Sequence, residues 1–383
     1  MTAGAQGKRT PLAAKLAQRI AEQGPISVAD YIDACLNDPD HGYYRTRSAI
    51  GREGDFITAP EVSQIFGELI GLWCAIVWQQ MGSPSKLNLV ELGPGRGTLM
   101  RDALRAVKVV PGFDRVLQVH LIESNASLEA EQRTTLEAVS ATTHWHADLA
   151  TALQPGGAIA ECPTILVANE FLDTLPVEQI VYRQGSWHRR WVAIDDHGDL
   201  SFTVAEDRAD APSALPAGIA PREGDIFEWA PQYESLARLL AARAAGAPLA
   251  ALFVDYGHVA MGFGDTLQAV AAHSHVSPLL APGETDLSTQ VDFARFVDAC
   301  AQLDLVADGP LTQAEFLGAL GIVQRASRLM SANPDKAGEI ELAVARLIAP
   351  GGMGTRFHVT GIRGVNVAPL PGLAPVDKGT RPA

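Results

Sequence analysis

Apolar positions recur along this chain with two spacings that alternate. Helical spacing is clear in Pro11–Glu22, where Leu12, Leu16 and Ile20 share one face. Short continuous apolar runs are typical of buried strands, and we expect strands at Leu87–Leu92, Val116–Ile122, Thr143–Trp145, Thr164–Ala168, Val177–Tyr182 and Ala250–Val254. Helical segments are expected before them at Glu61–Gln80 and between them at Thr98–Val107, Ser127–Val139 and Gln232–Ala245. This alternation predicts an α/β fold with a doubly wound sheet.

The rest of the chain is less regular. We expect a helix at Ser27–Leu36, an ordered loop over His41–Pro60, and a hairpin of Trp187–Ile194 and Leu200–Val204. Val291–Leu347 is expected to be mostly helical, with a last strand at Phe357–Gly361. We divide the chain into an N-terminal helical or lid region (1–85), packed on a core (86–383). The core carries an inserted α+β substrate subdomain at about 186–225 and 258–350.

Composition and charge narrow the classes of partner. The chain has 383 residues, of which 47% are hydrophobic and 19% charged, which excludes a disordered protein. Its net charge of −14 argues against nucleic acid, because neutralising phosphates requires a basic surface. An acidic protein suits a basic protein segment or a cationic ligand better.

Cysteine spacing and hydropathy indicate where the protein works. The four cysteines form no CxxC pair, which predicts a reducing compartment without a zinc ribbon or disulfide framework. The best apolar stretch, Leu69–Trp78, is too short to insert in a membrane and could equally form core or a homodimer interface. We expect a cytoplasmic bacterial protein. The mitochondrial matrix is the second choice: no acid precedes Glu22, as in a presequence, but that segment has no serine and only two arginines.

The sharpest motif is Glu91-Leu-Gly-Pro-Gly-Arg-Gly97, which lies between a predicted strand and a predicted helix. Gly93, Gly95 and Gly97, together with Pro94, would let the backbone approach a ligand without a Cβ in the way. The spacing matches neither the dinucleotide fingerprint nor a P-loop. Glu91 would repel a pyrophosphate but attract the amino group of S-adenosylmethionine. The alternative is a tight connection without a ligand.

Two acids follow the next strands. Glu123 ends a strand, where a carboxylate can accept both hydroxyls of a ribose. Asp148 follows the weak strand, where it could hold an adenine amino group or simply be a solvated loop acid. His273 and His275 lack further metal ligands, so we expect no metal site.

Polar side chains also follow the strand at Thr164–Ala168. Asn169, Glu170 and Asp173 would lie at the same sheet edge as the glycine motif. The two carboxylates could grip a guanidinium through paired N–H donors, or they could be first-turn acids of a capped helix. A further acid, Asp55, lies in the mixed-charge loop Gly51–Glu61, which could close over a cleft or simply begin a helix.

Several motifs together resemble the MidA-type S-adenosylmethionine-dependent methyltransferases, relatives of a mitochondrial complex I assembly factor that methylates an arginine. The motifs are Gly24-Pro-Ile-Ser27, His41-Gly-Tyr-Tyr44, Gly54-Asp-Phe-Ile-Thr-Ala-Pro-Glu61, Glu91–Gly97, Asn169-Glu-Phe-Leu-Asp-Thr-Leu-Pro-Val177 and Val254-Asp-Tyr-Gly257. The resemblance implies a class I methyltransferase fold with insertions and arginine N-methylation of a protein client, such as a respiratory complex I subunit. It places the glycine motif and Glu123 around the cofactor, and Asn169–Asp173 and the Asp55 loop near the reacting centre.

The mechanism that we expect is in-line displacement, in which a guanidinium nitrogen attacks the methyl carbon of the sulfonium, the bond from that carbon to sulfur breaks, and a neutral thioether leaves. Glu170, then Asp173, then Asp55 are the candidates to orient the guanidinium and spread its positive charge. Two other functions remain open: a non-catalytic assembly chaperone that binds the cofactor or a partner subunit, and a small-molecule N- or O-methyltransferase.

Overall fold

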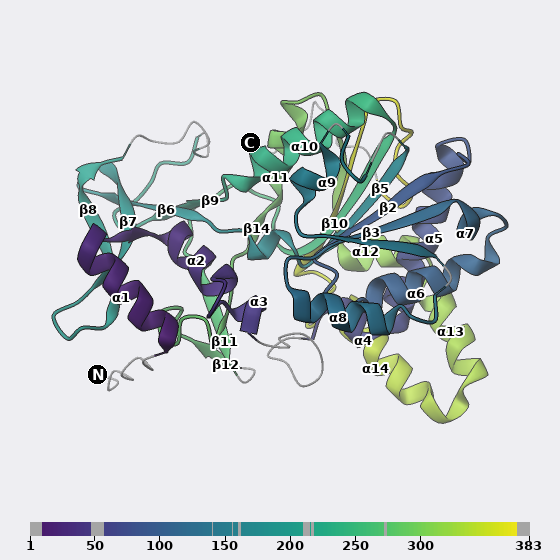
Figure 1. Ribbon diagram of the computed structural model, residues 1–383, viewed down its shortest axis with the longest axis horizontal. Helices are drawn as coiled ribbons and strands as arrows, with labels where there is room; N and C mark the ends of the chain where they lie inside the picture. The colour runs from purple at the N-terminus through teal and green to yellow at the C-terminus, as the bar shows by residue number, and fades with distance from the viewer. Residues whose placement is uncertain are drawn as a thin grey trace.

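An eight-stranded sheet forms one part of the molecule, and a five-stranded and a three-stranded sheet form the other part (Figure 1). The structure is a computed structural model that describes residues 10–46, 57–139, 141–154, 156–159, 162–209, 215, 218–271 and 274–373. In this part of the chain, no helix is both long and apolar enough to cross a bilayer.

The larger sheet has mostly parallel strands. Its main path runs β4 (Thr142–His146), β3 (Leu117–Ile122), β2 (Leu87–Leu92), β5 (Thr164–Asn169), β10 (Leu249–His258), β16 (Phe357–Arg363) and β15 (Val306–Thr312), and β14 (Val291–Asp292) pairs with β10. From β4 to β10 all neighbours are parallel, whereas β16 is antiparallel to both β10 and β15. Since parallel strands end at one edge, the loops after β2, β3 and β5 meet there.

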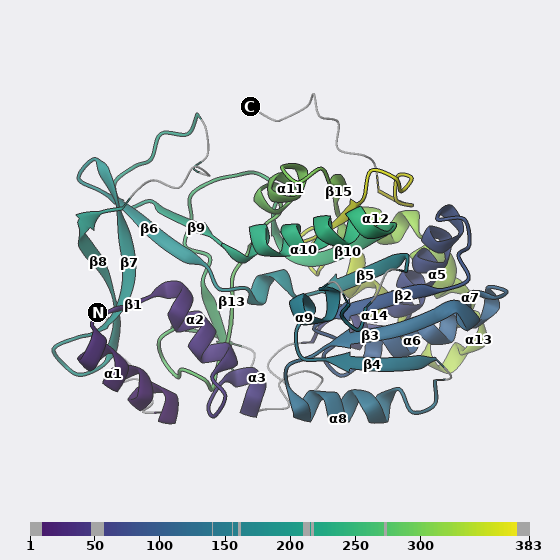
Figure 2. The same ribbon diagram turned by 45° about the horizontal axis from the view of Figure 1, so that its top comes forward.

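Helices cover both faces of this sheet, which explains why its strands read as continuous apolar runs. Leu252 and Val254 of β10 pack in a cluster shared with α5 (Gln64–Gln80), α6 (Thr98–Ala106), α12 (Gln313–Ala319), α13 (Ile322–Ala332) and α14 (Ala337–Ile348). Phe253 belongs to the other cluster, with residues of α9 (Leu149–Leu153), α10 (Gln232–Gly246) and α11 (Phe293–Ala301). Figure 2 shows these three helices close together. The predicted doubly wound α/β fold is confirmed.

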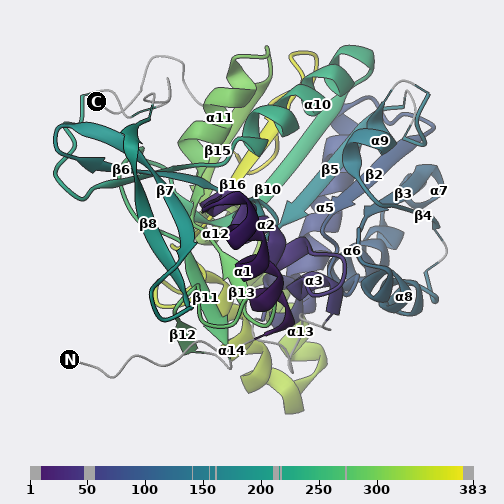
Figure 3. The same cartoon turned by 60° about the vertical axis from the view of Figure 1, so that its left-hand side comes forward.

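The second part of the molecule is built from two segments, the N-terminal region and the middle of the chain. Its main sheet contains β1 (Ile26–Ser27), β7 (Ser186–Ile194), β6 (Glu178–Arg183), β9 (Ile226–Trp229) and β8 (Leu200–Arg208). A three-stranded sheet of β12 (Ser274–Val276), β11 (Gln268–Ala271) and β13 (Asp286–Ser288) lies nearby. Figure 3 shows α1 (Pro11–Gln23) and α2 (Val28–Asn37) beside β7. Because β1 pairs with β7, the N-terminal helices belong to this part.

Some elements differ from the expectation. The helix expected over Glu61–Gln80 is divided at Ser63, which has extended backbone and caps α5 through its hydroxyl, so that α4 (Ala59–Val62) stands apart. Val291–Leu347, which is expected to be mostly helical, also contains strand β15 of the larger sheet. Because β11, β12 and β13 belong to the other part, the segment 258–350 is shared between the two parts. The remaining helices are α3 (Tyr43–Thr46), α7 (Phe113–Val116) and α8 (Ala126–Thr135).

Candidate functional site

The glycine motif forms the turn from β2 into α6. Gly93, Gly95 and Gly97 all have positive φ angles, of 58°, 54° and 79°, which favour glycine. A Cβ on Gly93 would also lie 3.2 Å from the ring of Phe171. The turn therefore needs glycine for its own backbone, and it leaves the N-terminus of α6 open to a ligand.

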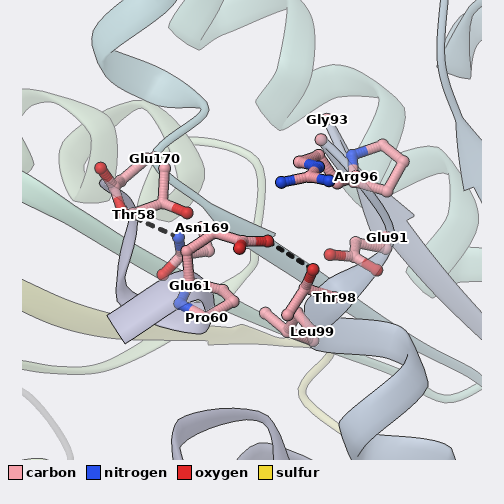
Figure 4. A pocket seen from close by; sticks show the side chains of 12 residues that line it. Thr58, Pro60, Glu61, Glu91, Gly93, Arg96, Thr98, Leu99, Asn169 and Glu170 are labelled. Carbon is pink, nitrogen blue, oxygen red and sulfur yellow. Dashed lines mark hydrogen bonds between the residues drawn. The ribbon is translucent and has the colours of Figure 1, made fainter. Parts of the chain in front are cut away.

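A pocket of about 390 Å³, partly open to solvent, lies against this turn (Figure 4). Four elements meet there: α4, the end of β2 with its glycine turn, the start of α6, and the end of β5. The lining residues are Thr58, Pro60, Glu61, Glu91, Gly93, Pro94, Gly95, Arg96, Thr98, Leu99, Asn169 and Glu170. The structure thus brings together six predicted residues: Glu91, Gly93, Pro94, Gly95, Asn169 and Glu170.

Glu91 is a buried carboxyl group in the wall of the pocket. Its side chain is only 3% exposed, and burial raises its pKa to about 8. Its Oε2 has no hydrogen-bond partner among the described residues. A buried acceptor without a donor is costly, so this position favours a ligand that brings a donor or a positive charge.

Glu123 lies beside the pocket, at the end of β3. Its Oε1 accepts the N–H of Asn125 (2.7 Å) and its Oε2 accepts Nε2 of Gln132 (3.1 Å). The same Nε2 donates to the carbonyl of Gly95 (2.8 Å). Gln132 therefore fixes Glu123 relative to the glycine turn. Burial raises the pKa of Glu123, and these donors oppose the rise.

Asp148 and Asp55 lie elsewhere. Asp148 is exposed and caps α9, because its Oδ1 accepts the N–H of Thr151 (2.8 Å); it does not line the pocket. Hydrogen bonding to Thr151 lowers its pKa. Asp55 falls outside the described residues, as does His273.

Asn169, Glu170 and Asp173 lie at the predicted sheet edge. Glu170 Oε1 accepts Nδ2 of Asn169 and the backbone N–H of Ala59, both at 3.1 Å. Burial and the neighbouring Asp173 carboxyl raise the pKa of Glu170 to about 8, and burial raises that of Asp173 to about 6. Two neighbouring carboxyls that resist ionisation form a site that a cation would stabilise.

The backbone of Glu170 is held in the left-handed region, with a φ of 51°, although it is not glycine. Its N–H donates to the carbonyl of Val254 (2.8 Å). Oδ2 of Asp255 accepts the next three N–H groups, those of Phe171, Leu172 and Asp173, at 2.9–3.2 Å. The end of β10 therefore clamps this turn and offsets its strain of about 1–3 kcal/mol.

The Asp255 carboxylate is itself buried. Burial and the nearby Asp173 and Glu170 carboxyls raise its pKa well above the ordinary value, while its four backbone donors, including the N–H of Tyr256 (2.9 Å), favour the ionised form. Sequence reasoning noted Asp255 only as part of a family motif, because the four donors are visible only in the folded turn.

Sequence reasoning also missed six lining residues: Thr58, Pro60, Glu61, Arg96, Thr98 and Leu99. Arg96 lies within the glycine motif and Thr98 follows it directly, so their positions in the sequence could have indicated them. Glu61 was part of the noted Gly54–Glu61 motif, but it was expected at the start of one long helix. Its separate helix α4 carries it to the pocket, where its Oε1 accepts the hydroxyl of Thr98.

Residues 69–311 match the sequence model of a family described as "Putative S-adenosyl-L-methionine-dependent methyltransferase". The chain is similar to the protein arginine methyltransferase NDUFAF7, mitochondrial, of Danio rerio, with 35% identity over 95% of this chain and 89% of the relative. The Homo sapiens protein of the same name is 34% identical, over 92% of this chain and 83% of the relative.

Two solved structures from Burkholderia thailandensis share the whole fold. One, bound to S-adenosyl-homocysteine, is 26% identical with a TM-score of 0.83, over 96% of this chain and 97% of that one. A native structure gives 26% identity and a TM-score of 0.80, over 97% and 98% of the two chains.

Proposed function

Because the chain belongs to this family of S-adenosyl-L-methionine-dependent methyltransferases, we propose that it methylates an arginine side chain of a protein client. The cofactor is S-adenosylmethionine, and the pocket fits it: the glycine turn is open, and Glu91 presents an unpartnered buried oxygen to a cation. When bound, S-adenosylmethionine supplies a methyl group on a positively charged sulfur. A nucleophile that attacks the methyl carbon displaces this sulfur as a neutral thioether.

We assign the cofactor-binding roles as follows. The glycine turn, Gly93–Gly97, would hold the amino-acid end of the cofactor together with Glu91 and Asn169. Glu123, fixed by Gln132, would accept the ribose hydroxyls. That Asp148 contacts the adenine stays a prediction. The alternative is that Asp148 serves only to cap α9.

The observation that carries the arginine assignment is a pair of neighbouring carboxyls: Glu170, which lines the cofactor pocket, and Asp173, which is buried next to it. A guanidinium is protonated in water and is a poor nucleophile, since its pKa exceeds ~12. Carboxylates can orient it in a bidentate manner and draw positive charge away from the attacking nitrogen. Asn169 and the N–H of Ala59 hold the Glu170 carboxyl for this task.

The relatives named as arginine methyltransferases support the same assignment, at 30–35% identity. The family resemblance extends the proposal to the client, which we propose to be a basic segment of a respiratory complex I subunit. Asp55, which precedes α4 in the sequence, is a third candidate at the reacting centre.

Methyl transfer to cell protein tests this function. The purified chain is incubated with S-adenosylmethionine labelled on its methyl group and with extract of cells that lack the gene. We expect label in protein, recovered as methylarginine after hydrolysis and enriched in the complex I fraction. Label only in small molecules, or in protein residues other than arginine, would contradict the arginine assignment.

Binding of the cofactor should release a proton from Glu91. The raised pKa of about 8 leaves this carboxyl mostly protonated at pH 7, and a bound cation favours its ionised form. Titration calorimetry with S-adenosylhomocysteine in phosphate and in Tris, which differ in ionisation enthalpy, should therefore give about one proton released at pH 7. Glu91→Gln should remove most of that release. Equal release in both proteins would show that Glu91 does not meet the cation.

A further inference from the structure

The short helix α4 brings a second carboxylate, Glu61, into the cofactor pocket. We propose that Glu61, together with Glu91 and Asn169, binds the ammonium group at the amino-acid end of S-adenosylmethionine. Glu61 precedes the stretch that matches the family model, which begins at residue 69, and it belongs to the N-terminal part of the chain. The proposal rests on the cofactor and not on the identity of the methyl acceptor.

The position of Glu61 is fixed from two sides. Its Oε1 accepts the hydroxyl of Thr98, the first residue of α6, so that Glu61 is tied to the end of the glycine turn. Two residues earlier, the N–H of Ala59 donates to Glu170 at 3.1 Å. In Figure 4 the Glu61 and Glu91 side chains are drawn on either side of the Thr98 hydroxyl, and all three residues line the pocket.

Two further acceptors in the same pocket lack donors. Glu91 Oε2 and Asn169 Oδ1 are buried and have no hydrogen-bond partner among the described residues, and their side chains belong to residues that are 3% and 9% exposed. The amide nitrogen of Asn169 is already used, because it donates to Glu170. Its oxygen therefore remains to receive a donor from a ligand.

An ammonium group matches this set of acceptors. It offers three N–H donors and a positive charge, and the pocket wall offers oxygens from Glu61, Glu91 and Asn169. Charge-assisted hydrogen bonds of this kind are shorter and stronger than neutral ones. The described residues contain no group of three or more His, Cys, Asp or Glu that could hold a metal ion, which favours an organic cation here.

Two ligands that differ at the amino-acid end test the proposal. S-adenosylhomocysteine carries the ammonium group, whereas 5′-methylthioadenosine keeps the adenosine and the thioether but lacks the amino-acid end. We expect Glu61→Gln to weaken S-adenosylhomocysteine roughly 10-fold in calorimetric titration, since one charge-assisted contact is lost. The affinity for 5′-methylthioadenosine should change less than about two-fold.

Controls separate this effect from charge and folding. Glu129→Gln removes one negative charge from the exposed face of α8, where Glu129 pairs with Arg133, and should leave both affinities unchanged. Glu61→Asp keeps the charge and should bind S-adenosylhomocysteine more tightly than Glu61→Gln. Unchanged affinity in Glu61→Gln, or equal weakening of both ligands, would overturn the proposal. If Glu61→Gln does not fold, Glu61→Asp decides, because its shortened side chain must weaken S-adenosylhomocysteine alone.

Discussion

Glu170→Gln should lower the rate of methyl transfer about 100-fold or more, which is the usual cost of losing a group that stabilises charge in the transition state. The amide can still accept the N–H of Ala59, so the local structure should persist. It cannot draw positive charge away from a guanidinium. The measurement is the single-turnover rate with labelled cofactor and the client protein.

The matched measurements for Glu170→Gln are cofactor affinity and pH dependence. Because its pKa is raised to about 8 and the ionised form attracts the guanidinium, kcat/KM of the parent should rise with pH toward about 8. The variant should lose this rise and should bind S-adenosylhomocysteine within about three-fold of the parent. Transfer at the parental rate with an unchanged pH profile would remove Glu170 from the mechanism.

Asp255→Asn should damage both stability and catalysis through the turn at Glu170. The amide offers only one acceptor oxygen and places an NH₂ group against backbone donors that the carboxylate accepts on both of its oxygens. We expect unfolding free energy to fall by roughly 2–4 kcal/mol, since buried hydrogen bonds to a charged group are lost. The turn then relaxes from its left-handed conformation and Glu170 moves.

Asp308→Asn is the matched control for Asp255→Asn. Asp308 is another buried carboxylate, bound to Arg363 (2.8 Å) and to the N–H of Leu370 (2.8 Å), and it lies outside the lining of the pocket. Both variants should unfold more easily in denaturant. Only Asp255→Asn should lower kcat about 30-fold or more with S-adenosylhomocysteine affinity nearly kept, because it alone shifts Glu170. Equal losses of kcat would make Asp255 merely structural.

The strand order of the larger sheet shows how far the sequence pattern reaches. Short, mainly apolar runs predicted β2, β3, β5 and β10, because strands buried on both faces need apolar side chains at most positions. β15 was missed, since its middle is Asp308-Gly309-Pro310. Its buried Asp308 is tolerated because Arg363 of β16, 55 residues later, neutralises it. A pattern of neighbouring residues in the sequence cannot reveal the pairing of Asp308 with Arg363.

Helix caps show the same limit at shorter range. Ser63 caps α5, and this separates α4 from the long helix that the apolar pattern predicts. The sequence offers Asp148 as a contact for adenine, and in the structure its carboxylate caps α9. Side chains that accept hydrogen bonds from nearby backbone look the same in sequence as side chains that await a ligand.

The sequence by itself determined the α/β fold, the glycine turn and the acidic residues at the strand ends, because apolar periodicity and a backbone that requires glycine are local properties. Only the tertiary structure decided that α4 crosses the pocket and that Asp255 clamps the turn at Glu170. The contacts of Ala59 with Glu170 and of Leu172 with Asp255 join residues 111 and 83 positions apart, and only burial in the folded chain makes Glu91 and Glu170 carboxyls that resist ionisation.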